Sequence, residues 1–270
     1  MPVLLPWVAV CAAAYGALAG SLLPRAAYRL AVPPETPRRE QCPAGHDLAG
    51  PLRGWLGPAR CPGCAAAVAA TGHGAAEVDE NPGRAAPSAA YGPSTSFFTL
   101  VTASVCAALA LCVGTRPELA VWLLTVPFAL LLASVDTRAQ RLPDILTLPL
   151  AAAMAVLLGL AALAPGAGGD WTDALLGGAA LTGAYFVLFL LNPRGMGFGD
   201  VKLALTSGLA LGWYGWNTLF AGTFLAFLLS ATFGLALLLT KRARWKTAVP
   251  FGPFMLLGTL AGVLGGGLVA

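Results

Sequence analysis

The sequence predicts an all-α integral membrane protein with about eight transmembrane helices and one cytoplasmic loop domain. Of its 270 residues, 57% are hydrophobic and only 10% are charged, whereas a soluble domain carries about 25% charged residues. The apolar residues are gathered into runs of about 20, the length that crosses a bilayer. The net charge is +4, and in such a protein the basic residues mainly indicate which side of the membrane each loop occupies. We therefore expect a lipid bilayer around the chain and no nucleic-acid partner.

The expected spans follow these apolar runs. The first covers residues 3–23, and the others are placed near 97–113, 119–135, 145–164, 174–191, 201–213, 217–240 and 248–269, of which 201–213 is short. Residues 24–96 are rich in Pro, Gly and Arg and poor in large apolar side chains, so they predict a loop domain without a sizeable core. A low-complexity linker is expected from about Ala65 to Ser96. The chain thus divides into residues 1–23, 24–96 and 97–270.

Basic residues predict the orientation of the spans. If the N-terminus is outside, eight basic residues lie on the cytoplasmic side and one, Arg116, lies outside. The eight are Arg138, Arg141, Arg194, Lys202, Lys241, Arg242, Arg244 and Lys246. Cytoplasmic loops of membrane proteins carry such an excess of Lys and Arg.

Two acids on that cytoplasmic side are candidate functional residues. Asp136 ends the third apolar run, and Asp200 begins the sixth behind Gly195, Gly197 and Gly199. Carboxylates at the membrane edge are costly and mark functional sites, and the glycines disfavour a continuous helix and let another backbone come close. Two neighbouring carboxyl groups share a proton, so one can activate water while the other protonates a carbonyl oxygen. This is the requirement for peptide hydrolysis without a metal or a covalent intermediate.

A structural interpretation of these acids stays open on spacing alone. Aspartate is common at helix N-caps, so Asp200 could cap the sixth span and Asp144, beside Pro143, the fourth. Under the catalytic interpretation, Lys202 is expected to favour the ionised form of Asp200 through its nearby charge.

Several motifs resemble those of a known family. Gly197-Phe-Gly-Asp200 resembles the GxGD motif of intramembrane aspartyl proteases, and its neighbours are similar to the type IV prepilin peptidases. The matching motifs are Asp136 followed by Leu142-Pro143-Asp144, then Asp200-Val201-Lys202, Pro250-Phe251-Gly252-Pro253, and Gly20-Ser21 followed by Tyr28-Arg29-Leu30. The resemblance implies cleavage of prepilin or pseudopilin leader peptides at the cytoplasmic face of the bacterial inner membrane. Asp136 and Asp200 are then the catalytic acids, Gly197, Gly199 and Lys202 belong to the active-site loop, and proteolysis needs no cofactor.

The cysteines of the loop depart from the family pattern of two Cys-x-x-Cys pairs. The second pair is intact as Cys61-Pro-Gly-Cys64, but the first reads Cys42-Pro-Ala-Gly-His46 and lacks one cysteine. Structural zinc takes four ligands, and three cysteines with one histidine are an accepted set. His46 is therefore a candidate fourth ligand, with a metal-free loop as the alternative.

The resemblance also implies a second activity, N-methylation of the new N-terminus with S-adenosylmethionine. The missing cysteine argues against this activity, and the chain has no glycine-rich cofactor fingerprint. We therefore expect the peptidase activity to be retained without it.

Other function classes predict different features. A proton-coupled carrier or channel would place acids at the bilayer midplane within inverted repeats, and the sequence has neither. A non-catalytic membrane subunit of pilus or secretion assembly, and a GxGD protease with another substrate, stay open as alternatives.

Overall fold

A computed structural model describes residues 4–33, 36–71, 89–193, 195–241 and 249–270, and it confirms the all-α prediction. Ten helices occur in these residues: α1 (Leu4–Leu30), α2 (Pro51–Gly54), α3 (Pro62–Thr71), α4 (Thr95–Val113), α5 (Glu118–Ala139), α6 (Asp144–Ala162), α7 (Trp171–Leu191), α8 (Phe198–Gly212), α9 (Trp216–Leu239) and α10 (Gly252–Val269). The extended pairing within the described part consists of two isolated bridges, Gln41 with Asp47 and Arg60 with Ala90. Arg194 and the basic residues at 242, 244 and 246 lie outside the described residues.

Seven helices of the described part are long and apolar enough to cross a membrane, namely α1, α4, α5, α6, α7, α9 and α10. The expected sixth span is α8, which has only 15 residues, fewer than the about 20 that a span requires. Its side chains from Leu203 to Gly212 are buried except Leu205. Because α8 packs against α6, α7, α9 and α10, protein rather than lipid surrounds it.

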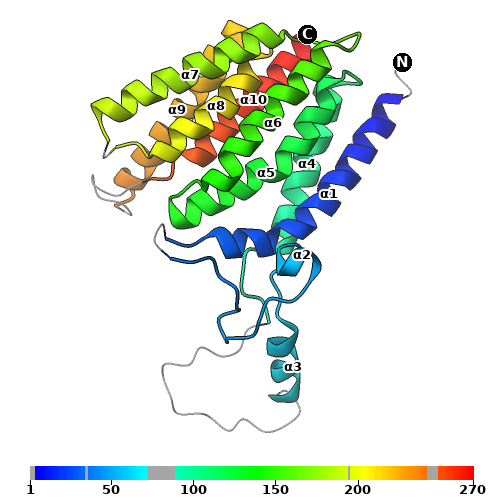
Figure 1. The fold of residues 1–270 in the computed structure, drawn as a ribbon, viewed down its shortest axis with the longest axis vertical. Coiled ribbons are helices and arrows are strands. Elements are labelled where there is room, and N and C mark those ends of the chain that lie inside the picture. Colours follow the sequence, from blue (N-terminus) through cyan, green and yellow to red (C-terminus); the bar gives the residue numbers. More distant parts are fainter. Residues whose placement is uncertain (1–3, 34–35, 72–88, 194, 242–248) are drawn as a thin grey trace.

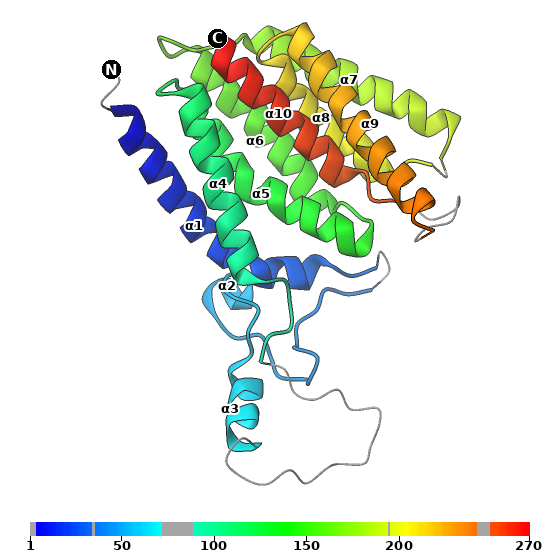
Figure 2. The same cartoon turned by 180° about the vertical axis from the view of Figure 1, so that it is seen from behind.

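The long helices form a bundle with the loop domain at one end (Figures 1 and 2). Neighbouring helices approach closely where both present small residues. A Cβ added at Gly177 of α7 would lie 2.8 Å from the carbonyl oxygen of Gly208 in α8. This close backbone contact is typical of small residues at helix interfaces in membranes, and it brings α8 against α7.

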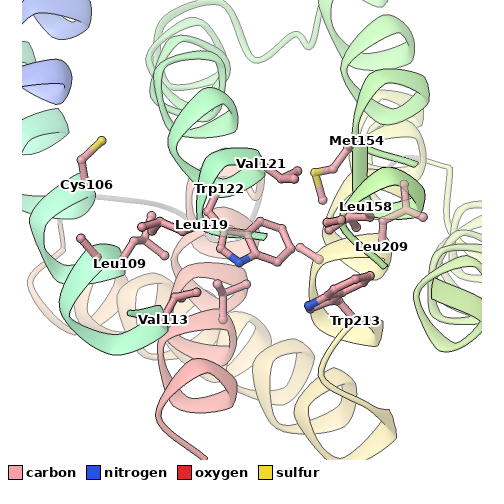
Figure 3. Packing of buried hydrophobic residues seen from close by; sticks show 14 of the residues in the cluster. Cys106, Leu109, Val113, Leu119, Val121, Trp122, Met154, Leu158, Leu209 and Trp213 are labelled. Atoms are coloured by element: carbon pink, nitrogen blue, oxygen red, sulfur yellow. The ribbon is translucent and has the colours of Figure 1, made fainter. Parts of the chain in front are cut away.

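The opposite end of the bundle holds the largest apolar core (Figure 3). Trp122 of α5, Met154 and Leu158 of α6, and Trp213 at the end of α8 are all buried there. Glu118 is fully buried at this end, and both of its carboxylate oxygens accept from the backbone N–H of Gly168, at 3.2 and 3.3 Å. This buried acid therefore ties the start of α5 to the α6–α7 loop.

The first helix is longer than the sequence predicted. It continues through Pro24 to Leu30 instead of ending at residue 23, and it bends toward its C-terminal end (Figures 1 and 2). Its last turns pack Ala27 and Leu30 against Leu131 and Val135 of α5. This apolar packing offsets the backbone hydrogen bond that proline cannot donate.

The loop domain is attached to this last part of α1. Arg25 Nη1 donates to the carbonyl oxygen of Ala49 at 2.6 Å, and Arg29 Nη1 donates to that of Arg53 at 2.8 Å. The expected linker is partly structured, because α3 runs to Thr71 and the Tyr91 ring packs on Tyr28 at 4.7 Å. Residues 72–88 of this linker lie outside the described residues.

Candidate active site and metal-binding cluster

Asp136 lies in the last turn of α5 and is only 5% exposed. Its Oδ2 accepts a hydrogen bond from the backbone N–H of Gly252, the first residue of α10, at 3.0 Å. A Cβ added at Gly252 would lie 2.7 Å from the same oxygen. The Pro-Phe-Gly-Pro motif therefore delivers a backbone amide to this carboxylate at a point that only glycine fits.

Asp200 lies in the first turn of α8 and is 7% exposed. Its Oδ2 accepts from the backbone N–H of Gly197, the N-cap residue, at 3.2 Å. The carboxylate thus takes part in capping the helix, although Gly197 and not Asp200 occupies the N-cap position. One oxygen of each acid is held by a backbone amide, which leaves the second oxygen of each for other partners.

The structure brings these two acids together. They are near enough for their charges to interact, although 64 positions separate them in the sequence. The α5–α6 loop contacts the start of α8 between them, since a Cβ added at Gly199 would lie 3.0 Å from the Leu142 Cβ. Leu142 also shares an apolar cluster with Leu132 of α5 and Val201 of α8. Both acids therefore lie at the end of the bundle that carries the loop domain.

Lys202 has a different partner from the one expected. Its Nζ lies 2.6 Å from Asp144 Oδ1 and 4.9 Å from the centre of the Phe198 ring. Asp144 is the first residue of α6, and Pro143 occupies the N-cap position in its place. The expectation that Asp144 caps α6 is therefore wrong, and its carboxylate instead joins the start of α6 to the start of α8.

Nothing in the sequence pattern singles out Tyr185, which lies in the middle of an apolar run. It is 1% exposed, and its ring packs against Phe227 and Phe251 with centroid distances of 5.7 and 5.9 Å. Its hydroxyl is buried without a hydrogen-bond partner among the described residues, near enough to Asp200 for an electrostatic interaction. A polar residue inside an otherwise apolar run was the available signal.

Four potential metal ligands gather in the loop domain: Cys42, His46, Cys61 and Cys64. His46 Nδ1 lies 3.6, 3.5 and 3.4 Å from the three sulfur atoms in that order, and the Cys42 and Cys64 sulfur atoms are 3.7 Å apart. Tetrahedral zinc with bonds of about 2.3 Å to sulfur and about 2.0 Å to nitrogen separates its ligand atoms by about 3.5–3.8 Å. The spacing of this cluster therefore fits a tetrahedral metal ion.

Backbone hydrogen bonds hold the segments that carry Cys42, His46 and Cys61. The Cys42 N–H donates to the His46 carbonyl oxygen at 2.9 Å, and the Cys61 N–H donates to that of Ala89 at 2.9 Å. Burial raises the pKa of the Cys64 thiol to about 11, and the neighbouring Cys61 and Cys42 add to this shift. A bound cation would offset this cost by compensating the thiolate charge of Cys64.

The fold and the two acids define a class of protein, a multi-pass membrane protein with a buried aspartate pair at one end of its bundle. The model of the type IV leader peptidase family matches residues 123–239 of this chain, a range that contains both acids. The chain belongs to the type IV leader peptidase family.

Similar proteins extend the match over most of the chain. The prepilin leader peptidase/N-methyltransferase of Aeromonas salmonicida (strain A449) is 32% identical over 84% of this chain and 70% of its own length. The protein of the same name from Burkholderia pseudomallei (strain 1026b) is 29% identical over 94% of this chain and 74% of its own length. That of Pseudomonas aeruginosa is 36% identical over 47% of this chain and 42% of its own length. No solved structure matches the chain.

Proposed function

We propose that this chain is an intramembrane aspartyl endopeptidase that removes the leader peptides of prepilins or pseudopilins at the cytoplasmic face of the membrane. The observation that carries the proposal is the pair of buried acids, Asp136 and Asp200, each held by one backbone amide and close enough for their charges to interact. Family membership and the names of the relatives support the choice of substrate.

The proposed reaction uses the free oxygen of each carboxyl group. The ionised acid takes a proton from a water molecule, and the oxygen of that water forms a bond to the scissile carbonyl carbon. The protonated acid donates its proton to the carbonyl oxygen, so that a neutral tetrahedral species forms. Its collapse breaks the C–N bond, and a proton from the dyad goes to the leaving amine. Burial of both side chains excludes bulk water and strengthens these proton transfers.

The position of the acids matches the shape of a prepilin. Such a substrate has a short basic leader followed by a long apolar helix, so its scissile bond lies at the membrane surface. The two acids lie at the bundle end that carries the loop domain, where the basic residues Arg138, Arg141 and Lys202 also occur. This excess of basic residues supports a cytoplasmic location for that end.

Tyr185 is the candidate hydrogen-bond donor of this site. A buried hydroxyl without a partner costs about 1–3 kcal/mol, so its presence beside Asp200 calls for a partner outside the chain. The carbonyl oxygen of the scissile bond gains negative charge during the reaction and would accept this hydrogen bond. Tyr185 would then stabilise the charge that develops on this oxygen from the α7 side of the site.

For the loop domain we propose a structural zinc ion held by Cys42, His46 Nδ1, Cys61 and Cys64. The ligand spacing supports this, as does the Gly63 backbone, on which an added Cβ would lie 3.2 Å from the His46 ring. Zinc bound there would link residues 42–46 to residues 61–64 and so stabilise a domain with little apolar core. His46 would thereby replace the cysteine that the family pattern has and this sequence lacks.

A second activity, N-methylation, appears in the names of the relatives. The missing cysteine was the argument against N-methylation. That argument does not apply if His46 completes the set of four metal ligands. A cavity of about 1190 Å³ separates residues 36–41 of the loop domain from residues 141–145, which follow Asp136. Its charged lining residues Arg39, Glu40, Asp47 and Arg141 would supply the polar groups that hold S-adenosylmethionine. This cavity supports a methyl-donor site near the new N-terminus.

One experiment tests the peptidase proposal. The purified chain in nanodiscs is incubated with prepilins of its own organism, and the N-termini of the products are read by mass spectrometry. The proposal expects one new N-terminus between the basic leader and the apolar helix. Intact prepilins would favour a non-catalytic assembly subunit, whereas cleavage elsewhere would favour a GxGD protease with another substrate.

A further inference from the structure

Among the described residues, a groove on the lipid-facing surface of the bundle lies beside Asp136, because Thr137 and Pro253 line it. We infer that this groove, between α4, α5 and α10, holds the apolar helix of the substrate during cleavage. The inference rests on the proposed peptidase function and adds where the substrate binds. Residues of all three helices line the groove.

The groove has an apolar floor and apolar walls. Its volume is about 690 Å³. Small residues of α5, Ala129 and Ala133, lie on its floor, while Phe97 of α4 and Leu257 of α10 line its sides. Phe97 is 57% exposed and Leu257 is 51% exposed. An apolar partner would therefore remove large side chains from lipid contact and lie close to the α5 backbone, as small residues permit at helix interfaces in membranes.

The dimensions fit one helix. The groove follows α5 from Val126 to Arg138, which is about 18 Å at a rise of 1.5 Å per residue. A helix of about three turns would fit along this length, with its other side toward lipid.

The groove is continuous with the proposed active site. Pro253 lines it, and the preceding residue, Gly252, donates its backbone N–H to Asp136. Thr137, the residue after Asp136, also lines it. A helix lying in the groove would consequently end beside Thr137 and Pro253, which adjoin Asp136 and the glycine that binds it, and the chain preceding that helix would continue toward the acids.

The polar end of the groove suits the first turn of a helix. Ser134, Thr137 and Arg138 lie there, at the end nearest the loop domain. The first backbone N–H groups of a helix have no internal partners, and the hydroxyl oxygens of Ser134 and Thr137 can accept from them. The Arg138 guanidinium can donate to carbonyl groups of the unwound chain that precedes the helix.

Photo-crosslinking tests this location. A benzophenone amino acid is placed at Phe97 or Leu257, and in matched controls at Phe220 of α9 or Val156 of α6, which are 65% and 62% exposed on other faces. The Asp200→Asn background keeps the substrate uncleaved, and the probe is a purified prepilin that the wild-type chain cleaves. We expect prepilin adducts at the two groove positions, at least about tenfold above the controls.

The outcomes separate the two proposals. Adducts mainly at Phe220 or Val156, or only lipid adducts in the groove, would overturn the groove assignment while leaving the peptidase proposal intact. Failure of the wild-type chain to cleave any prepilin would overturn the peptidase proposal itself. Kinetic measurements on two variants test the groove independently. Ala133→Phe fills the groove, and Ala153→Phe on the exposed face of α6 is its control. We expect Ala133→Phe alone to raise KM for prepilin about tenfold, and equal KM values would contradict the assignment.

Discussion

The backbone N–H of Gly252 lies 3.0 Å from Asp136 Oδ2, across 116 positions of sequence. This contact joins the start of α10 to the end of α5, and a side chain at position 252 has no room, because a Cβ would lie 2.7 Å from the carboxylate oxygen. The geometry of Asp136 therefore depends on a glycine in another helix.

Replacing this glycine should displace the acid. We expect Gly252→Ala to lower kcat/KM for prepilin cleavage by about 100-fold or more, since shifts of about 1 Å in a catalytic group have effects of this size. The matched control is Gly265→Ala in the same helix, where an added Cβ meets nothing within 4 Å. Both variants are measured at equal amounts of folded protein, and equal activity of the two would contradict the role of Gly252.

Tyr185→Phe removes only the buried hydroxyl. If that hydroxyl donates to the developing oxyanion, kcat should fall on the order of 100-fold, while KM changes little because the interaction forms during the reaction. Tyr214→Phe is the control, since its hydroxyl accepts from Trp122 Nε1 at 3.1 Å at the far end of the bundle. A loss of folding with unchanged kcat in Tyr185→Phe would show that the hydroxyl is structural.

Disrupting the Lys202–Asp144 ion pair should lower prepilin cleavage slightly, and exchanging the two residues should restore it. Asp144 is 63% exposed, so the coupling is expected to be about 1 kcal/mol or less. Asp144→Lys, which puts two cations together, should lower cleavage, and the exchange Asp144→Lys with Lys202→Asp should restore most of it. If the exchange is worse than either single change, Lys202 acts on something other than Asp144.

Removal of the metal should affect the loop domain but leave proteolysis unchanged. We expect the purified chain to contain one zinc ion by elemental analysis, His46→Ala to lose it, and His46→Cys to keep it, because cysteine also supplies a zinc ligand. His73→Ala, outside the described residues, is the control. Peptidase activity should persist after chelation, because neither acid belongs to the cluster. One bound zinc ion in His46→Ala would contradict the ligand assignment.

Local sequence patterns predicted the helices and the two acids for physical reasons that hold in this structure. Apolar runs become helices because a bilayer leaves backbone groups no partners other than their own. Asp136 and Asp200 stand at the ends of such runs, where a carboxylate is costly and therefore indicates a functional site. Ligand counting likewise selected His46, since three cysteines leave one position of a tetrahedral site open.

Other features depend on tertiary contacts that a sequence does not display. The apolar run predicted that the first span ends at residue 23, but packing of Ala27 and Leu30 on α5 continues the helix to Leu30. Lys202 was expected to act on Asp200 because it is two residues away, yet residues i and i+2 of a helix do not face each other. Its side chain reaches Asp144 in α6 instead. The sequence does not indicate that the backbone amide of Gly252 contacts Asp136, because 116 positions of sequence separate the two residues.

The central claim is that Asp136 and Asp200 act together in peptide hydrolysis. The most direct measurement compares prepilin cleavage by Asp136→Asn, Asp200→Asn and, as the control, Asp144→Asn, each at equal folded amounts in nanodiscs, with product N-termini read by mass spectrometry. The account predicts no detectable product from Asp136→Asn or Asp200→Asn and nearly wild-type cleavage by Asp144→Asn. Correctly processed prepilin from either of the first two variants would contradict it.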